Sequence, residues 1–145
     1  MSDEAAIREV VERYFYSLDA RDPEALLSCF TQDATARYHV GNIGERATVG
    51  ARAIADEIMA NQRRYPASNH TASSVYMVDR GDHVAVCTFA VAHVYNGAII
   101  VVRGLRYDDD FVREDGAWRI RARSHAPQWQ YEAAGVPPQM KPPER

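Results

Sequence analysis

The chain has 145 residues and a mass of 16.3 kDa, which fits one domain and leaves little room for a second. Hydrophobic residues make up 46% of the chain and charged residues 26%, a composition typical of a globular protein with a packed core. Lys and Arg number 17 against 20 Asp and Glu, and a net charge of −3 argues against a protein that holds nucleic acid by neutralising phosphates. Small neutral or apolar ligands are better candidates.

The cysteines and the N-terminal residues indicate a cytoplasmic protein. Cys29 and Cys87 are too few for a disulfide framework or a four-thiolate metal site, and each lies in an apolar run, so we expect both to be core thiols. No stretch is long enough for a membrane span, and the acidic residues 1–4 lack the basic and apolar regions of a signal peptide. We therefore expect neither membrane nor nucleic acid as a partner.

The first predicted elements are two helices. Apolar residues recur at three- and four-residue spacing over residues 7–18, opposite a charged face, which predicts an amphipathic helix. Asp22 followed by Pro23 is typical of an N-cap and a first helical position, so a short second helix is expected over residues 24–30. We expect the two helices to form a hairpin.

A strand and a third helix follow. Residues 34–40 have strand character and end at a turn that contains Gly41-Asn42 and Gly44. A helix is expected from residue 51 to about residue 64, because its apolar positions have helical spacing and Pro66 ends it.

The second half is predicted to be an antiparallel meander. Turn signals, including the strong hairpin dipeptide Asn96-Gly97, separate four expected strands over residues 70–78, 83–95, 98–113 and 117–125. The proline-rich residues 126–145 are expected to be a tail, so a single domain spans residues 1–125. Helices followed by a curved antiparallel sheet make an α+β domain, and a sheet that curls around a helix leaves a conical pocket for a ligand.

Asp19 occupies a position that local helix physics does not favour. It lies roughly 40° beyond Phe15 on the edge of the apolar face, and at the C-terminus of the helix, where the macrodipole disfavours a carboxylate. One interpretation is a solvated turn residue that pairs with Arg21. The other is a half-buried carboxylate at the mouth of a pocket, partnered with a histidine.

Three further residues combine a structural and a functional interpretation. Tyr14 lies within the apolar face of the first helix and Tyr38 on the first strand, so each hydroxyl needs either a backbone partner or a ligand. His70 opens the first meander strand, and histidine is the side chain suited to acid–base work near neutral pH. With five histidines in the chain, composition alone does not single out His70.

The last predicted strand alternates strictly between two faces. Its basic face carries residues 119, 121, 123 and 125, opposite a face with Trp118 and Ile120. That face is either solvated or turned into the cavity at one end, where Arg123 or His125 would bind an oxyanion or carboxylate. No nucleophile elbow, phosphate loop, dinucleotide fingerprint or metal-ligand spacing is present, which leaves acid–base chemistry or plain binding.

Several segments carry a family resemblance: residues 7–10 with Tyr14, Leu18 and Asp19, then Arg21-Asp22, residues 30–34, Asn69-His70 and residues 115–120. Together they resemble the SnoaL-like division of the nuclear-transport-factor-like superfamily over residues 4–125. The resemblance implies an α+β cone, three helices packed in a strongly curved antiparallel sheet, and assembly into a homodimer or homotrimer. It does not define the activity, because the superfamily includes isomerases, cyclases, dehydratases and binding domains.

The site positions resemble the scytalone dehydratase, bile-acid 7α-dehydratase and hexachlorocyclohexane dehydrochlorinase branch. This resemblance implies a catalytic Asp19–His70 dyad assisted by Tyr14, Tyr38 and Arg123. The same pattern predicts a substrate-binding surface that includes Phe15, Trp118 and His125. Either His125 or His93 is the candidate for the position of the second histidine of scytalone dehydratase.

The resulting hypothesis is a lyase without cofactor or metal that acts on a small hydrophobic, ring-containing substrate. The alternatives are an isomerase or polyketide-cyclase-like proton transfer on a ring ketone, and a small-molecule-binding domain without catalysis.

Overall fold

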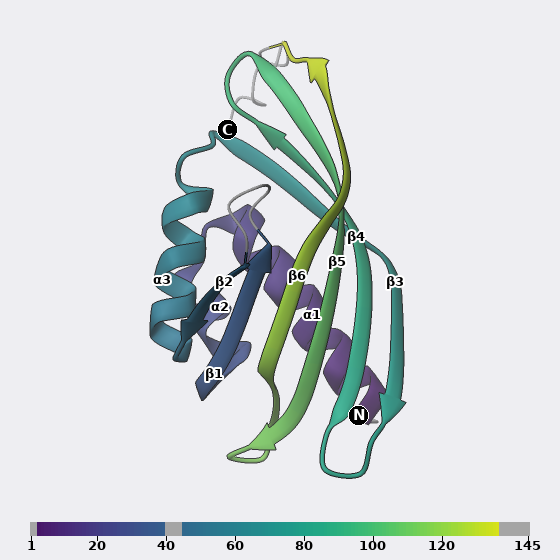
Figure 1. Ribbon diagram of the computed structural model, residues 1–145. Helices are drawn as coiled ribbons and strands as arrows, with labels where there is room; N and C mark the ends of the chain where they lie inside the picture. Colours follow the sequence, from purple (N-terminus) through teal and green to yellow (C-terminus); the bar gives the residue numbers. More distant parts are fainter. Residues whose placement is uncertain (1–2, 40–44, 137–145) are drawn as a thin grey trace, which may run out of the picture.

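The computed structural model describes residues 3–39 and 45–136. Its elements, in chain order and labelled in Figure 1, are α1 (Asp3–Ala20), α2 (Pro23–Ser28), β1 (Phe30–His39), β2 (Glu45–Val49), α3 (Ala51–Gln62), β3 (Ala67–Asp79), β4 (Val84–Tyr95), β5 (Ile99–Glu114) and β6 (Ala117–Ala134). None of the described helices is long and apolar enough to cross a membrane.

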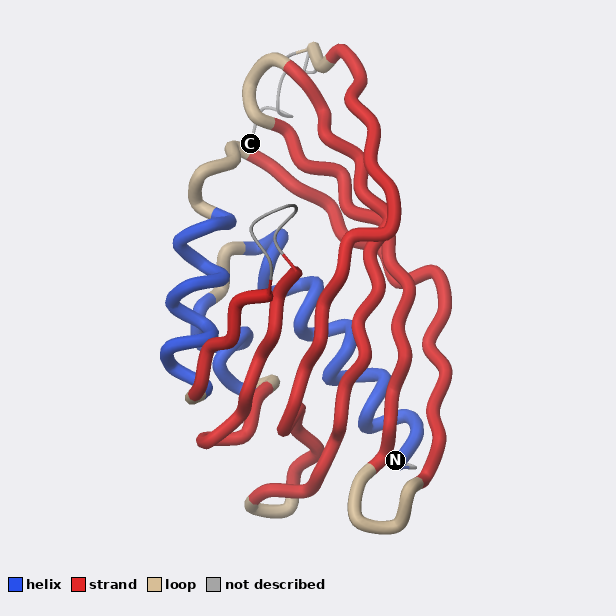
Figure 2. Tube along the Cα trace, viewed as in Figure 1, coloured by secondary structure: helices blue, strands red, loops and turns tan. Residues whose placement is uncertain are grey.

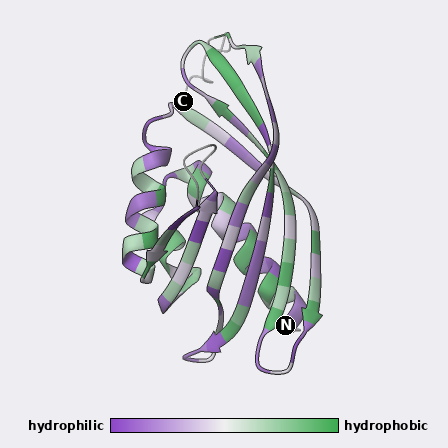
Figure 3. Cartoon of the chain, in the orientation of Figure 1, coloured by the Kyte–Doolittle hydropathy of each residue, from purple (hydrophilic) through white to green (hydrophobic). Residues whose placement is uncertain are grey.

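One six-stranded sheet, in the order β2-β1-β6-β5-β4-β3, forms the body of the fold. The sheet is strongly bent and carries the three helices on one side, so the predicted α+β cone is confirmed (Figure 2). The sheet is mixed rather than purely antiparallel, because β1 pairs with β6 in parallel. Buried and more exposed positions alternate along most of β4 and β5, as expected for strands with one face on a core. Figure 3 shows that β4 is mostly hydrophobic.

The predicted α1 is present, and its apolar stripe is the centre of the core. Residues Ile7, Val10, Val11, Tyr14, Phe15 and Leu18 are all buried. The opposite face carries the ion pairs Arg8–Glu4 and Arg13–Glu9 at helical i,i+4 spacing.

The segment after α1 departs from the sequence prediction in two respects. The second helix ends at Ser28 rather than residue 30, because Phe30 already opens β1 beside Ile120 and the Ile120 N–H donates to the Cys29 carbonyl at 2.8 Å. A strand that was not predicted, β2, pairs antiparallel with β1. The turn predicted around Gly41–Gly44 lies outside the described residues.

The prediction that a tail begins at residue 126 is wrong, because β6 continues to Ala134 and pairs with β5 as far as Ile99. Pro127 is tolerated in this strand because the pairing of β1 with β6 ends at His125, which leaves β6 an edge beyond that point. Residues 137–145 of the predicted tail lie outside the described part of the chain.

A β-bulge at Arg121 decides which side chains of β6 face the helices. Phe111 pairs with Ile120 and Asp110 with Ala122, so Arg121 is an extra residue without a partner on β5. The predicted strict alternation is therefore broken. Ile120 and Arg123, three residues apart, are both buried on the inner face.

Candidate active site

A cavity of about 740 Å³ lies between α1, α3 and the inner face of the sheet. Its lining includes Tyr14 and Leu18 from α1, Ile58, Asn61 and Gln62 from α3, Tyr38 from β1, His70 from β3, Ala92 and Val94 from β4, Arg103, Leu105 and Tyr107 from β5, and His125, Pro127 and Gln130 from β6. The interior is mostly apolar and aromatic with a few polar groups, as is usual for a small-molecule site.

His70 lines this cavity, and Asp19 contacts it from outside the lining. The His70 Nδ1 lies 2.7 Å from Asp19 Oδ1, and the His70 backbone N–H donates to Asp19 Oδ2 at 2.7 Å. The Asp19 carboxylate thus accepts the Nδ1 proton, which leaves Nε2 as the free ring nitrogen, without a partner among the described residues. The His70 ring is stacked on Phe15 at 5.9 Å and its side chain is only 4% exposed, so its orientation is fixed from two directions.

The turn after α1 holds the carboxylate in place. Arg21 adopts a left-handed conformation (φ 57°) and donates to the Leu18 carbonyl at the end of the helix and to Ser68 Oγ at 2.9 Å. Ser68 in turn donates to Asp19 Oδ1 at 2.9 Å. The Arg21 guanidinium therefore offsets the negative end of the helix dipole, which explains why a carboxylate is tolerated there.

Burial alone would raise the pKa of Asp19, but the hydrogen bonds from the His70 side chain and backbone and from Ser68 bring that pKa below its ordinary value. Asp19 is therefore ionised near neutral pH. An ionised carboxylate on Nδ1 orients the imidazole and stabilises the charge that His70 acquires when Nε2 takes a proton.

Tyr14, Tyr38, Tyr107 and His125 form an aromatic cluster in the cavity. The His125 ring lies 5.4 Å from Tyr38 and 4.7 Å from Tyr107. Burial raises the pKa of all three phenols, so they remain protonated hydrogen-bond donors. Burial and the nearby Arg123 charge lower the pKa of His125 to about 3, so its imidazole is neutral. The Tyr38 hydroxyl and His125 Nδ1 are buried and have no hydrogen-bond partner among the described residues.

Arg123 lies behind this cluster and does not line the cavity. Its guanidinium donates to both carboxylate oxygens of Asp109, at 2.8 and 2.7 Å, and lies 4.0 Å from the centre of the Tyr14 ring. Burial alone would lower the pKa of Arg123, but the facing Asp109 carboxylate raises it well above its ordinary value. The predicted role of Arg123 in binding an oxyanion or carboxylate of a ligand is thus not supported, because the Asp109 carboxylate of the chain itself occupies that position.

The comparison with known families decides the affiliation of the chain. The model of the SnoaL-like domain matches residues 1–124, nearly the whole described fold. The chain belongs to the SnoaL-like domain family. No curated protein sequence matches the chain.

Solved structures with the same fold as this SnoaL-like domain include enzymes. The hexachlorocyclohexane dehydrochlorinase LinA-type3 from Novosphingobium barchaimii superposes with a TM-score of 0.77 at 20% identity, covering 97% of this chain and 94% of its own. A scytalone-dehydratase-like protein from Novosphingobium aromaticivorans gives 0.77 at 19% identity, over 99% and 94%. The protein Kfla4162 from Kribbella flavida gives 0.79 at 17% identity, over 89% and 93%. At these identities the likeness establishes the fold.

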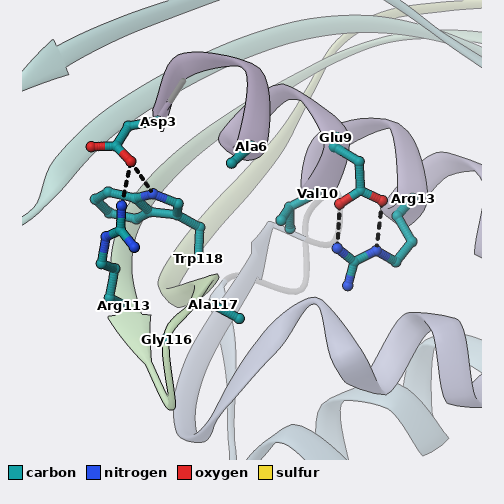
Figure 4. Close-up of a pocket in the computed structure, with 9 residues that line it drawn as sticks. All are labelled: Asp3, Ala6, Glu9, Val10, Arg13, Arg113, Gly116, Ala117 and Trp118. Atoms are coloured by element: carbon teal, nitrogen blue, oxygen red, sulfur yellow. Dashed lines mark hydrogen bonds and ion pairs between the residues drawn. The ribbon is translucent and has the colours of Figure 1, made fainter. Parts of the chain in front are cut away.

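Besides Asp19 and Arg123, three of the predicted site residues of the SnoaL-like domain lie outside the cavity lining. Trp118 belongs to a smaller pocket at the start of α1, where its Nε1 donates to Asp3 at 3.2 Å beside Arg113 (Figure 4). The substrate-binding role predicted for Trp118 therefore has no support in its position. Phe15 reaches the site through ring contacts, by stacking on His70 and by edge-to-face contacts with Tyr14 and Tyr107. His93 is exposed on the outer face of β4, away from the dyad.

Two residues of the site were missed at the sequence level. Tyr107 lines the cavity together with Tyr14, and Asp109 neutralises the charge of Arg123. Asp109 stands in the run Asp108-Asp109-Asp110, which has the character of a solvated acidic stretch, and only the strand alternation of β5 distinguishes its middle member. Among the described residues, no group of His, Cys, Asp or Glu could hold a metal ion.

Proposed function

We propose that this SnoaL-like domain is a cofactor-independent lyase that removes water or hydrogen halide from a small hydrophobic, ring-containing substrate. The observation that carries the proposal is the buried His70, oriented by an ionised Asp19, with its free nitrogen at a cavity large enough for a ring system. Two structural neighbours, a dehydrochlorinase and a scytalone-dehydratase-like protein, are named for activities of this class.

In the proposed reaction, His70 Nε2 takes a proton from a substrate carbon. The electron pair of the broken C–H bond forms a C=C bond, and the hydroxyl or halide on the neighbouring carbon leaves with the electrons of its own bond. His70 then carries the proton as an imidazolium, whose charge Asp19 stabilises across the 2.7 Å contact. When a hydroxyl leaves, the proton that completes water comes from His70 or a phenol.

The aromatic cluster supplies hydrogen bonds to the other end of the substrate. Tyr38 has a buried, unpartnered hydroxyl, and Tyr14 lines the same wall, so either phenol is suited to donate to a leaving hydroxyl or an activating carbonyl oxygen. Arg123 acts through Tyr14, because its charge lies over that ring and favours negative charge developing near the phenol. This assignment replaces direct contact between Arg123 and the substrate.

The test is turnover of hexachlorocyclohexane, of scytalone, and of halogenated or hydroxylated ring compounds that carry a carboxylate, followed by mass spectrometry of the products. His70→Ala and Asp19→Asn are each expected to lower kcat by about 10²-fold or more, the usual contribution of general-base catalysis. His83→Ala is a matched control, because His83 also lies 2.7 Å from an aspartate, Asp82, but outside the cavity.

Each outcome of that test discriminates between functions. A product that lacks HCl or water, formed by the wild type and the control but not by the dyad variants, supports the lyase. A product of unchanged mass contradicts elimination and favours isomerisation. Turnover that survives His70→Ala contradicts the role of the dyad.

A further inference from the structure

The rim of the cavity carries an excess of positive charge. Here the rim denotes the exposed or half-buried charged and amide side chains of the lining: Arg46, Glu57, Asn61, Arg64, Arg103 and Gln130. Arg46 is paired with Glu57 at 3.1 Å, so these two charges offset each other. Arg103 and Arg64 have no acidic partner among the described residues, which leaves the rim with two uncompensated cations.

Arg103 is the better placed of the two. It is half-buried on β5, whereas Arg64 is exposed beyond the end of α3. The Arg103 Nε donates to Gln130 Oε1 at 3.1 Å, across the register pair of β5 and β6, and this bond fixes the plane of the guanidinium. The two terminal nitrogens of Arg103 remain free, and together they match the two oxygens of a carboxylate.

Within residues 3–39 and 45–136, no carboxylate forms an ion pair with Arg103, in contrast to Arg123, which lies deeper on the same face. The charge of Arg123 is neutralised by Asp109 in the buried part of the sheet. The side chain that Arg103 faces, Gln130, is a neutral amide. A half-buried cation without a counter-ion at the mouth of an otherwise apolar cavity favours an anionic ligand group.

We propose that the substrate carries a carboxylate, which Arg103 and Gln130 bind at the rim while the ring lies on the apolar wall below. This inference rests on the proposed function, since it assigns the substrate class of the same cavity. Arg103, Leu105 and Tyr107 alternate along one strand and all line the cavity. Four residues of strand span at most about 13 Å, so the carboxylate lies about one ring system away from the aromatic cluster.

The test compares two probes that differ in charge and share a ring, 2-naphthoate and 2-naphthamide, by isothermal titration calorimetry. The wild type is expected to bind 2-naphthoate at least about tenfold more tightly, as for a charge-assisted pair. Arg103→Met is expected to remove that preference and leave 2-naphthamide binding unchanged. Arg80→Met is the control, since Arg80 is exposed in the turn between β3 and β4, far from the rim, and removes the same charge.

Equal affinities of the wild type for the two probes would overturn the inference, as would a preference for 2-naphthoate that survives Arg103→Met. A second measurement needs no variant: the Arg103 Nε–H NMR signal of the wild type should move on addition of 2-naphthoate but not of 2-naphthamide, and a signal that stays in place also contradicts the proposal. Repeating the titration with His70→Ala separates the two proposals, because the carboxylate preference should persist there whether or not the domain is a lyase.

Discussion

Replacing Asp109 with Asn removes the negative charge that faces Arg123 and leaves almost everything else in place. Asp109 and Arg123 have side chains that are 0% and 2% exposed, and both oxygens of the carboxylate accept hydrogen bonds from the guanidinium. Asn has the same shape but is neutral, so Asp109→Asn leaves a guanidinium charge buried between the rings of Tyr14 and Tyr107 without a counter-ion.

The expected loss of stability is large. Removing one partner of a fully buried ion pair costs about 3–5 kcal/mol, because the remaining charge cannot be solvated. A domain of this size is stable by about 5–15 kcal/mol, so the variant should remain folded but lose a substantial part of that free energy of unfolding. With a denaturant slope of about 2 kcal/mol per molar urea, the midpoint should fall by about 2 M.

The assay is urea unfolding followed by tryptophan fluorescence, with Asp108→Asn as the matched control. Asp108 is the neighbouring residue and pairs with Arg106 at 2.8 Å, but both side chains are about half exposed, so its loss should change the midpoint little. The double variant Asp109→Leu with Arg123→Met removes both charges and should be more stable than Asp109→Asn alone. The reasoning is refuted if Asp109→Asn unfolds at the same urea concentration as Asp108→Asn.

Three smaller predictions concern other parts of the core. Burial raises the pKa of the Cys29 thiol to about 11, so iodoacetamide at pH 8 should label Cys87 before Cys29 in the native protein. Peptide mass spectrometry measures the labelling of each cysteine, and equal labelling would contradict the burial of Cys29. The pKa of His125 is about 3 in the folded state and 6.5 in the unfolded state, so between these values only the unfolded state gains a proton and stability falls as the pH drops below 6.5. Between pH 7 and pH 5 the wild type should therefore lose about 2 kcal/mol more stability than His125→Gln. Parallel pH profiles of the two proteins would exclude this pKa shift. A Cβ at Gly104 would lie 2.1 Å from the Trp129 ring, so Gly104→Ala should displace that indole from its stack on Tyr131. The tryptophan fluorescence spectrum should then shift to the red, and an unchanged spectrum would show that the ring does not cover this glycine.

The sequence predicted the fold best where local signals and burial agree. The apolar spacing of α1, the Asp22-Pro23 start of α2 and the Asn96-Gly97 turn all mark elements that the structure contains. The strand β2 was missed because its sequence, Glu45 to Val49, is short and largely exposed, so it has no buried face to reveal it. The strand β2 is therefore recognised only by its pairing with β1 and not by a pattern in its own sequence.

For the candidate site, the sequence indicated which residue was unusual but not how it was satisfied. Asp19 stood out because a carboxylate at a helix C-terminus is unfavourable, and the structure places it against His70. The compensating chain through Arg21 and Ser68 joins residues 47 apart and could not be inferred from spacing. The partner of Arg123 was equally hidden, since it depends on the register of β5 and β6.

The bulge at Arg121 decides how β6 must be aligned with the sequences of related chains. After Ile120, the next buried residue of β6 is Arg123, three positions along the chain, whereas a regular strand would bury the residue two positions along. Deleting Arg121 would restore regular alternation, because Ala122 would still pair with Asp110 and Arg123 would follow Ile120 by two residues on the same face. Alignments of related chains that are one residue shorter here must therefore place a gap inside this strand, or they will equate a buried guanidinium with a solvent-facing side chain.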